Sequence, residues 1–125
     1  MSASASSLLL ANSAAEIALR MGGDDVVALD VSGPLPFADV FLLVTGTSER
    51  NVSAIAREIE DGLADEGYRL QRREGREEGR WVLLDFGDLV VHVFHQEDRA
   101  YYALERLWRD CPVVPLNAQR REDAG

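Results

Sequence analysis

The spacing of apolar residues predicts three helices. Apolar side chains recur every three or four positions over residues 7–21, 52–63 and 101–108, which is the period of one buried helix face. Ser48 can cap the second helix with its side-chain oxygen, and Gly67 can end it. The chain therefore carries one helical pattern near its start, one in its middle and one near its end.

Five strands are predicted between these helices. Residues 25–31 form a short β-branched run, and residues 39–46 are continuously apolar, as in a strand that is buried on both faces. Residues 68–74 alternate like an edge strand, and GREEG reads as a polar turn. The stretch WVLLDFGDLVVHVFH, residues 81–95, reads as two strands joined by a tight turn.

The order of these elements indicates one α/β domain. Helix, two strands, helix, three strands and helix fit a mixed sheet of about five strands with helices on its faces. We place this domain at residues 7–112 and expect residues 1–6 and 113–125 to be flexible termini.

The last hairpin has two unlike faces. If its turn is centred on Phe86-Gly87, Leu84 pairs with Leu89 and alternate residues share a face. One face is then entirely aliphatic and belongs in the core. We expect the other face to be open to solvent, and it carries Trp81, Leu83, Asp85, Asp88, Val90, His92 and Phe94.

Charge and composition narrow the possible partners. The 125 residues include 22 acidic and 13 basic side chains, a net charge of −9, and every basic residue is arginine. Such a chain repels nucleic acid and suits a basic protein partner. No basic residue precedes the short leucine run 8–10, so neither a signal peptide nor a membrane span is predicted, and we expect a cytoplasmic protein.

Metal binding and catalysis are poorly supported. Cys111 is the only cysteine, which excludes an internal disulfide and a thiolate zinc cluster. His92 and His95 lie three positions apart on one strand and therefore face opposite ways. Asp85 and Asp88 flank a turn, where carboxylates are usually solvated. We predict no metal, no cofactor and no catalytic residue.

Four interpretations of the second hairpin face remain open. It can be a docking surface, in which a partly exposed tryptophan anchors a partner and carboxylates form the rim. It can be a second buried face, covered by the C-terminal helix and filled by Trp81. It can be a homodimer interface. It can also serve a small nucleotide-binding enzyme that uses the TGTS turn at residues 45–48 and the hairpin carboxylates with magnesium.

Two long segments resemble one known family. ADVFLLVTGTSERNVSAIAREIEDGL and EEGRWVLLDFGDLVVHVFHQEDRAYYALERLW, in this order and at this spacing, are similar to the ribosomal silencing factor family, RsfS, also called Iojap-like. The resemblance covers nearly all of the predicted domain. It implies a nucleotidyltransferase-like fold that lacks the catalytic residues.

The resemblance also implies a function. Members bind ribosomal protein L-fourteen on the intersubunit face of the large ribosomal subunit, block joining of the small subunit and so repress translation under nutrient limitation. The basic ribosomal protein would be the partner, with little or no direct nucleic-acid contact. The residues implied to bind it are Trp81, Leu83, Asp85, Asp88, Val90 and His92.

Overall fold

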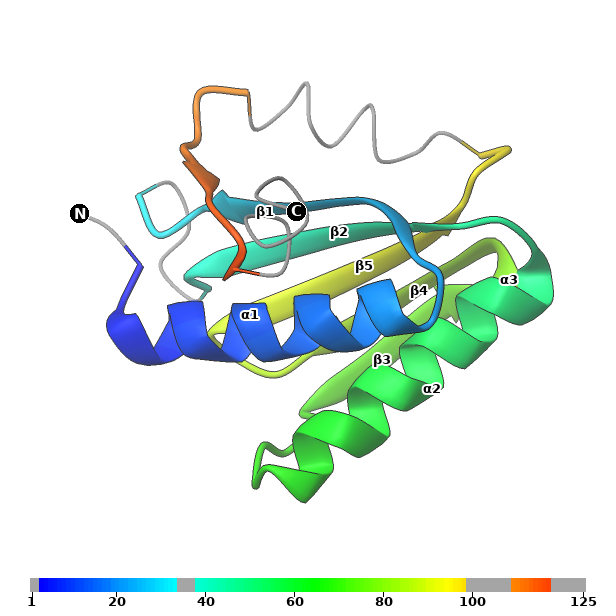
Figure 1. The fold of residues 1–125 in the computed structure, drawn as a ribbon, viewed down its shortest axis with the longest axis horizontal. Coiled ribbons are helices and arrows are strands. Elements are labelled where there is room, and N and C mark those ends of the chain that lie inside the picture. The colour runs from blue at the N-terminus through cyan, green and yellow to red at the C-terminus, as the bar shows by residue number, and fades with distance from the viewer. Residues whose placement is uncertain (1–2, 34–37, 99–108, 118–125) are drawn as a thin grey trace.

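The computed structural model describes residues 3–33, 38–98 and 109–117 and contains a mixed sheet with helices packed against it (Figure 1). The sheet has six strands in the order β3-β4-β5-β2-β1-β6. In chain order the elements are α1 (Ala5–Arg20), β1 (Asp24–Asp30), β2 (Val40–Gly46), α2 (Glu49–Asp65), β3 (Arg72–Arg76), α3 (Glu77–Arg80), β4 (Trp81–Asp85), β5 (Leu89–His95) and β6 (Val113–Val114). The predicted α/β class is confirmed, with one strand more than expected.

The centre of the sheet is a parallel pair. β2 and β5 run side by side in register from Val40 opposite Leu89 to Gly46 opposite His95, and every residue of both strands is buried. All other neighbouring strands are antiparallel. The continuous apolar runs that predicted these strands reflect burial on both faces.

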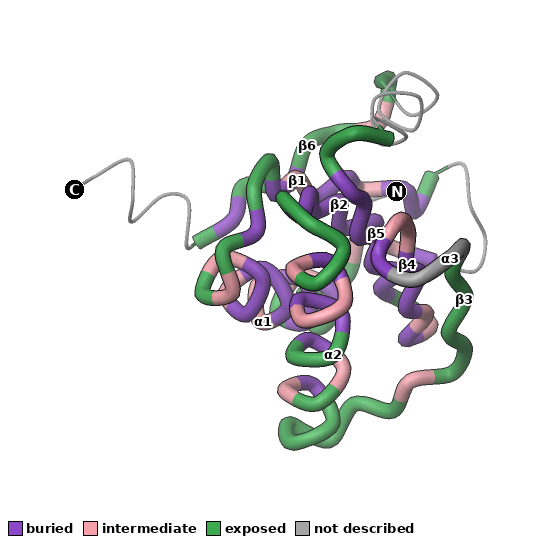
Figure 2. Tube along the Cα trace, turned by 90° about the vertical axis from the view of Figure 1, so that its right-hand side faces the viewer, coloured by how far each residue is buried: buried purple, intermediate pink, exposed green. Residues whose placement is uncertain are grey.

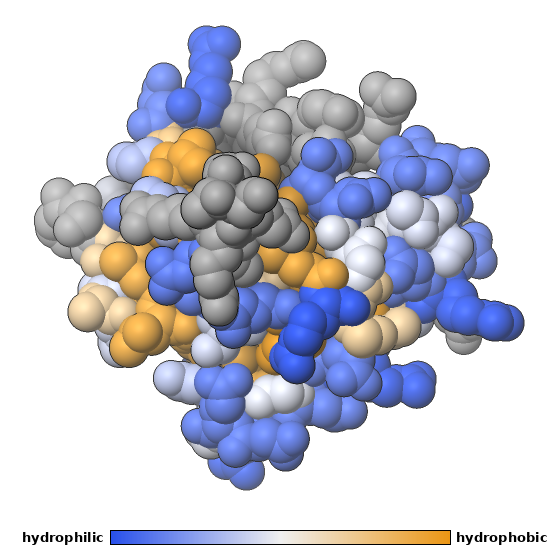
Figure 3. Space-filling view, in the orientation of Figure 1, coloured by the Kyte–Doolittle hydropathy of each residue, from blue (hydrophilic) through white to orange (hydrophobic). Residues whose placement is uncertain are grey.

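The helices α1 and α2 lie on the same face of the sheet (Figure 1). Their apolar sides join the inward residues of β1, β2, β4 and β5 in one core cluster. The predicted cap is confirmed, because the Ser48 hydroxyl accepts a hydrogen bond of 3.0 Å from the N–H of Asn51. In the view onto the helix side, hydrophilic residues dominate the lower part of the surface, and apolar side chains gather at its centre and left (Figure 3).

A second core cluster occupies the opposite face of the sheet. It contains no residue of α1, α2 or α3 and comprises Leu29, Val31, Ala38, Phe41, Leu43, Leu83, Val90 and Phe94, with Val27, Trp81 and Cys111 packed against it. The helix predicted over residues 101–108 lies outside the described residues.

Both ends of the folded part extend beyond the predicted limits 7–112. At the N-terminal end, α1 already begins at Ala5, and the N–H of Ala3 donates to Asp30 Oδ2 at 2.8 Å. At the other end, β6 pairs with β1, and Leu116 is only 1% exposed. The segments 1–6 and 113–125 were expected to be flexible, but their described parts contact the domain through these hydrogen bonds and through the buried side chains of Val114 and Leu116.

The edge strand and the turn after it differ from the prediction. The edge strand spans Arg72–Arg76 instead of 68–74. Residues 77–79 of the predicted GREEG turn, together with Arg80, form the short helix α3. Residues 72–75 of β3 are exposed (Figure 2), so charged side chains protect this sheet edge. None of the helices in the described ranges is long and apolar enough to cross a bilayer.

Gly79 allows α3 to pack against the start of α2. It has φ +77°, and a Cβ atom there would overlap the backbone of Glu49. Gly79→Ala should therefore lower the free energy of unfolding by about 2 kcal/mol or more. Gly67→Ala is the matched control, because Gly67 also has a positive φ of +94° and, its chain neighbours aside, no described residue lies within 4 Å of the added methyl group. Chemical denaturation of both variants measures the effect, and equal stability would contradict the packing described here.

Candidate docking surface

The strand register of the β4–β5 hairpin differs from the prediction by two residues. Leu84 faces Val91 rather than Leu89, and Phe86 donates its N–H to the Leu89 carbonyl at 2.9 Å. The turn is therefore centred on Gly87-Asp88, and Gly87 adopts φ +93°. Side chains of alternate residues point to the same face of a strand. A shift of two residues therefore changes the cross-strand partners and leaves each side chain on its predicted face.

The residues predicted to share a face do so, with Asp88 in the turn beside them. Cross-strand pairs on this face join Trp81 to Phe94, Leu83 to His92 and Asp85 to Val90. This face belongs to the second core cluster rather than to the helix side. We use the name docking surface for Trp81, Leu83, Asp85, Asp88, Val90 and His92.

The docking surface is less open than predicted. Leu83, Val90 and His92 are only 9%, 8% and 6% exposed, so the expectation that they face solvent is wrong. Trp81 and Asp85 are half-buried, and Asp88 is exposed. The alternative of a buried face therefore holds for the middle of the hairpin, and accessible side chains remain at its tryptophan end and at its acidic turn.

His92 lies among aromatic rings. Trp81 Nε1 donates to His92 Nδ1 across 3.4 Å, and the two rings are nearly parallel, with an interplanar angle of 22°. Phe94 stacks on the imidazole at a centroid distance of 5.9 Å, and Phe41 meets it edge-on at 5.1 Å. Sequence reasoning had missed Phe41, which reaches this group from β2 and is found only through the sheet order.

The imidazole of His92 is electrically neutral near pH 7. Burial lowers its pKa from 6.5 to about 4. Since Nδ1 accepts the hydrogen bond from Trp81, the single ring proton belongs on Nε2. That Nε2 atom is buried and has no hydrogen-bond partner among the described residues.

The acidic end of the hairpin shapes the turn. Asp85 Oδ1 accepts the N–H of Gly87 at 2.8 Å, as a turn-forming aspartate does. The Asp88 carbonyl accepts the N–H groups of Asp39 and Val40 at 2.9 and 3.0 Å, which ties the turn to the start of β2. Within the ranges that the structure describes, no group of three or more acidic, histidine or cysteine side chains is placed to hold a metal ion.

The second half of the TGTS turn, Thr47 and Ser48, makes hydrogen bonds within the fold. The N–H of Thr47 donates to Asn51 Oδ1 at 2.9 Å, Ser48 caps α2, and Glu49 adds a negative charge to the first helical turn. These contacts leave the turn poorly suited to binding phosphate.

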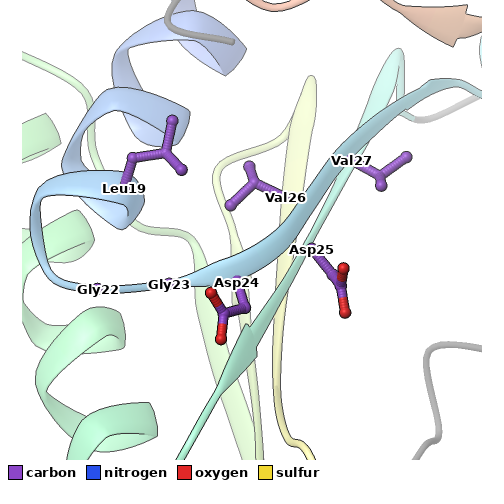
Figure 4. A pocket seen from close by; sticks show the side chains of 7 residues that line it. All are labelled: Leu19, Gly22, Gly23, Asp24, Asp25, Val26 and Val27. Carbon is purple, nitrogen blue, oxygen red and sulfur yellow. The ribbon is translucent and has the colours of Figure 1, made fainter. Parts of the chain in front are cut away.

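A depression of about 580 Å³ lies beside β1, and the carboxylates of Asp24 and Asp25 that line it also disfavour phosphate. It is lined by Leu19, Gly22, Gly23, Asp24, Asp25, Val26 and Val27 (Figure 4).

The structure defines a small α/β protein with a mixed sheet, and the comparisons identify its family. Residues 4–125 match the family described as ribosomal silencing factor during starvation, RsfS. The chain is 49% identical to the ribosomal silencing factor RsfS of Bacillus subtilis over 94 residues, which cover 75% of this chain and 80% of that protein. It is 50% identical to RsfS of Halalkalibacterium halodurans over 93 residues, covering 74% and 80%.

A solved structure agrees with this assignment. A crystal structure of a Chromobacterium violaceum protein matches with a TM-score of 0.76 and 36% identity, covering 80% of this chain and 83% of that one. The chain therefore belongs to the ribosomal silencing factor family, which is regulatory and non-enzymatic. The predicted family and the absence of enzymatic activity are confirmed by these relatives.

Burial of His92 predicts a specific pH dependence of stability. The pKa of this imidazole is about 4 in the folded protein and 6.5 for an ordinary solvated histidine, so the unfolded chain binds the proton more readily between these limits. The free energy of unfolding should fall as the pH falls, by about 2 kcal/mol between pH 7.5 and pH 5.

His92→Phe should remove this part of the pH dependence. Carboxylate titration is common to both proteins and cancels in the comparison. Urea denaturation at several pH values measures the difference, and an equal slope in the two proteins would show that His92 does not titrate as described.

Proposed function

We propose that this protein binds the large ribosomal subunit through ribosomal protein L-fourteen and sterically blocks joining of the small subunit. It would thereby repress translation under nutrient limitation, acting in the cytoplasm on the intersubunit face of the large subunit. Membership of the ribosomal silencing factor family supports the proposal. The observation that carries it is the combination, on one hairpin, of a partly accessible tryptophan and an acidic turn.

Trp81 suits the centre of such an interface. A tryptophan offers a large apolar area and loses little side-chain freedom on binding, which is why it often supplies much of the binding energy. Its indole already packs against the second core cluster and against His92. A partner that covers the accessible part of the ring would extend this apolar packing outward.

The acidic turn suits the rim. Asp88 is exposed and Asp85 is half-buried, so both can face basic side chains of a partner while they remain partly hydrated. We propose that these two carboxylates and Trp81 make the direct contacts. Leu83, Val90 and His92 would then contribute by supporting the contact residues from within the fold.

The distribution of charge favours a protein partner over RNA. The chain carries a net charge of −9, and a nucleic-acid surface would need arginines free to neutralise phosphates. Three arginines of the described ranges, Arg72, Arg73 and Arg80, lie within ion-pair distance of carboxylates, and over the whole chain the acidic residues outnumber the basic ones, which disfavours phosphate. Direct contact with nucleic acid would therefore be small.

Removing the indole should weaken binding to the large subunit. Trp81→Ala should cost about 2 kcal/mol or more of binding free energy, as the loss of a buried aromatic anchor does. Co-sedimentation with purified large and small subunits, measured separately, gives the affinity. Tyr68→Ala is the matched control, because it removes an exposed aromatic ring that lies between α2 and β3.

Three results would count against the proposal. They are binding to the small subunit alone, binding to neither subunit, and undiminished binding by a folded Trp81→Ala variant. Analytical sedimentation of the free protein over a range of concentrations accompanies the assay, because a homodimer that buries the same surface would compete with ribosome binding.

The two carboxylates should act mainly on the rate of association. Asp85→Asn combined with Asp88→Asn should slow association and flatten its dependence on salt, with a smaller effect on dissociation. Asparagine at position 85 keeps an oxygen that can accept the Gly87 N–H. Stopped-flow or surface-based binding kinetics at several salt concentrations measure the effect.

The matched control removes two carboxylates elsewhere. Asp24 and Asp25 are exposed at the start of β1, which lies at the opposite end of the strands from the hairpin turn. Asp24→Asn with Asp25→Asn changes the net charge equally, and asparagine tolerates the positive φ of residue 25. Equal slowing in both double variants would show that total charge, rather than the acidic turn, governs association.

A further inference from the structure

Within the described ranges, one side chain accepts the indole N–H of Trp81. Its N–H donates to His92 Nδ1 at 3.4 Å, and its ring lies nearly parallel to the imidazole, with centroids 6.2 Å apart. Trp81 stands at the first position of β4, next to the short helix α3, and is half-buried. An unrestrained tryptophan at such a position could adopt several rotamers.

His92 is itself fixed. It lies on the central strand β5 and is only 6% exposed. Phe94 stacks on it at an interplanar angle of 6°, and Phe41 packs against it from β2 at 60°. The acceptor atom that Trp81 meets is therefore part of the rigid core.

A histidine at position 92 lowers the stability of the fold relative to an apolar side chain. Of the described rings that contact His92, those of Phe41 and Phe94 are apolar, and the indole of Trp81 offers a hydrogen-bond donor and no acceptor. The Nε2–H of His92 is therefore buried without an acceptor in the described part of the chain. A buried donor without a partner destabilises a fold, whereas an apolar side chain of similar size would pack here without that penalty. Stability alone therefore does not account for the imidazole. The atom that distinguishes it from an apolar residue is Nδ1, and the described contact of Nδ1 is the indole of Trp81.

We propose that His92 is a positioning residue, whose Nδ1 fixes the indole of Trp81 in the orientation that the ribosomal partner meets. This inference rests on the proposed function and refines it, because His92 then acts through Trp81 instead of touching the partner. Holding the ring in place before binding reduces the side-chain entropy lost on association. The neutral imidazole that burial enforces keeps the Nδ1 lone pair available.

Leucine and asparagine at position 92 separate positioning from packing. The two side chains are similar in size and branch at the same atom, but only asparagine places an acceptor oxygen where Nδ1 stands. His92→Leu should weaken binding to purified large subunits about three- to tenfold, as the loss of one neutral hydrogen bond does. His92→Asn should bind more tightly than His92→Leu and yet be less stable in urea, because its amide is buried among apolar rings.

The two variants are thus expected to rank in opposite orders: His92→Asn binds more tightly, and His92→Leu is more stable. A purely structural role predicts the same order in both measurements. If His92→Leu binds as well as the wild type, or if the two variants rank alike in binding and in stability, the positioning role is overturned.

A double-mutant cycle tests whether His92 acts through the indole. Trp81→Phe keeps an aromatic ring and removes the N–H donor. In that background His92→Leu should cause little further loss of binding, because the hydrogen bond is already absent. A loss as large as in the wild type would mean that His92 contacts the partner directly, and the proposal would fall.

The indole N–H signals give a readout that does not involve the ribosome. The chain has two tryptophans, so its ¹H–¹⁵N spectrum holds two indole signals, and the one lost in Trp81→Phe belongs to Trp81. We expect faster exchange of this N–H with solvent in His92→Leu than in the wild type. Unchanged exchange would contradict the positioning role.

The two proposals can fail separately. A wild-type protein that binds no large subunit would overturn the proposed function together with this inference. Wild-type binding that is lost in Trp81→Ala but unaffected by His92→Leu would leave the function standing and overturn the inference alone.

Discussion

The parallel pairing of β2 with β5 is the constraint on which the rest of the structure depends. Parallel strands cannot be joined by a tight turn, so the chain between them must cross one face of the sheet. The helix α2 makes that crossing, and β3 and β4 then join the sheet beside β5. Both strands are buried along their whole length, which requires apolar side chains on both faces. One consequence is that the sheet has two cores, and only one of them contains residues of the described helices.

The second core explains why the hairpin can serve as a rigid platform. Its middle residues are packed, while Trp81 and the acidic turn stay within reach of a partner. Anchoring groups at the border of a packed region lose little freedom on binding. The buried middle thus contributes stiffness to the surface, even though it was predicted to contribute contact area.

Much of the central architecture follows from local patterns. The strands β2 and β5 and the helix α2 are predicted because their apolar repeats and the Ser48 cap are encoded within each segment. The sixth strand could not be predicted in this way, since β6 has only two residues and forms by pairing with the free edge of β1. Tertiary pairing, rather than propensity, creates such an element.

The candidate site was predicted in composition and only partly in geometry. Strand alternation gave the correct face, because an error of two residues in register leaves the face unchanged. The register itself depends on which two residues of DFGD form the turn, and the conformation of Gly87 decides it. The alternation of residues along a strand also does not show what covers each face, so the burial of Leu83, Val90 and His92 could not be predicted from it.

Asp39 joins two distant parts of the chain. Its carboxylate accepts the N–H of Ser4 and the hydroxyl of Ser7, and its own N–H reaches the carbonyl of Asp88 in the hairpin turn. Residues 4–7 are therefore held beside the acidic end of the hairpin. An affinity tag or fluorescent fusion attached ahead of residue 3 would emerge next to that turn, where its bulk would screen the carboxylates from a large assembly.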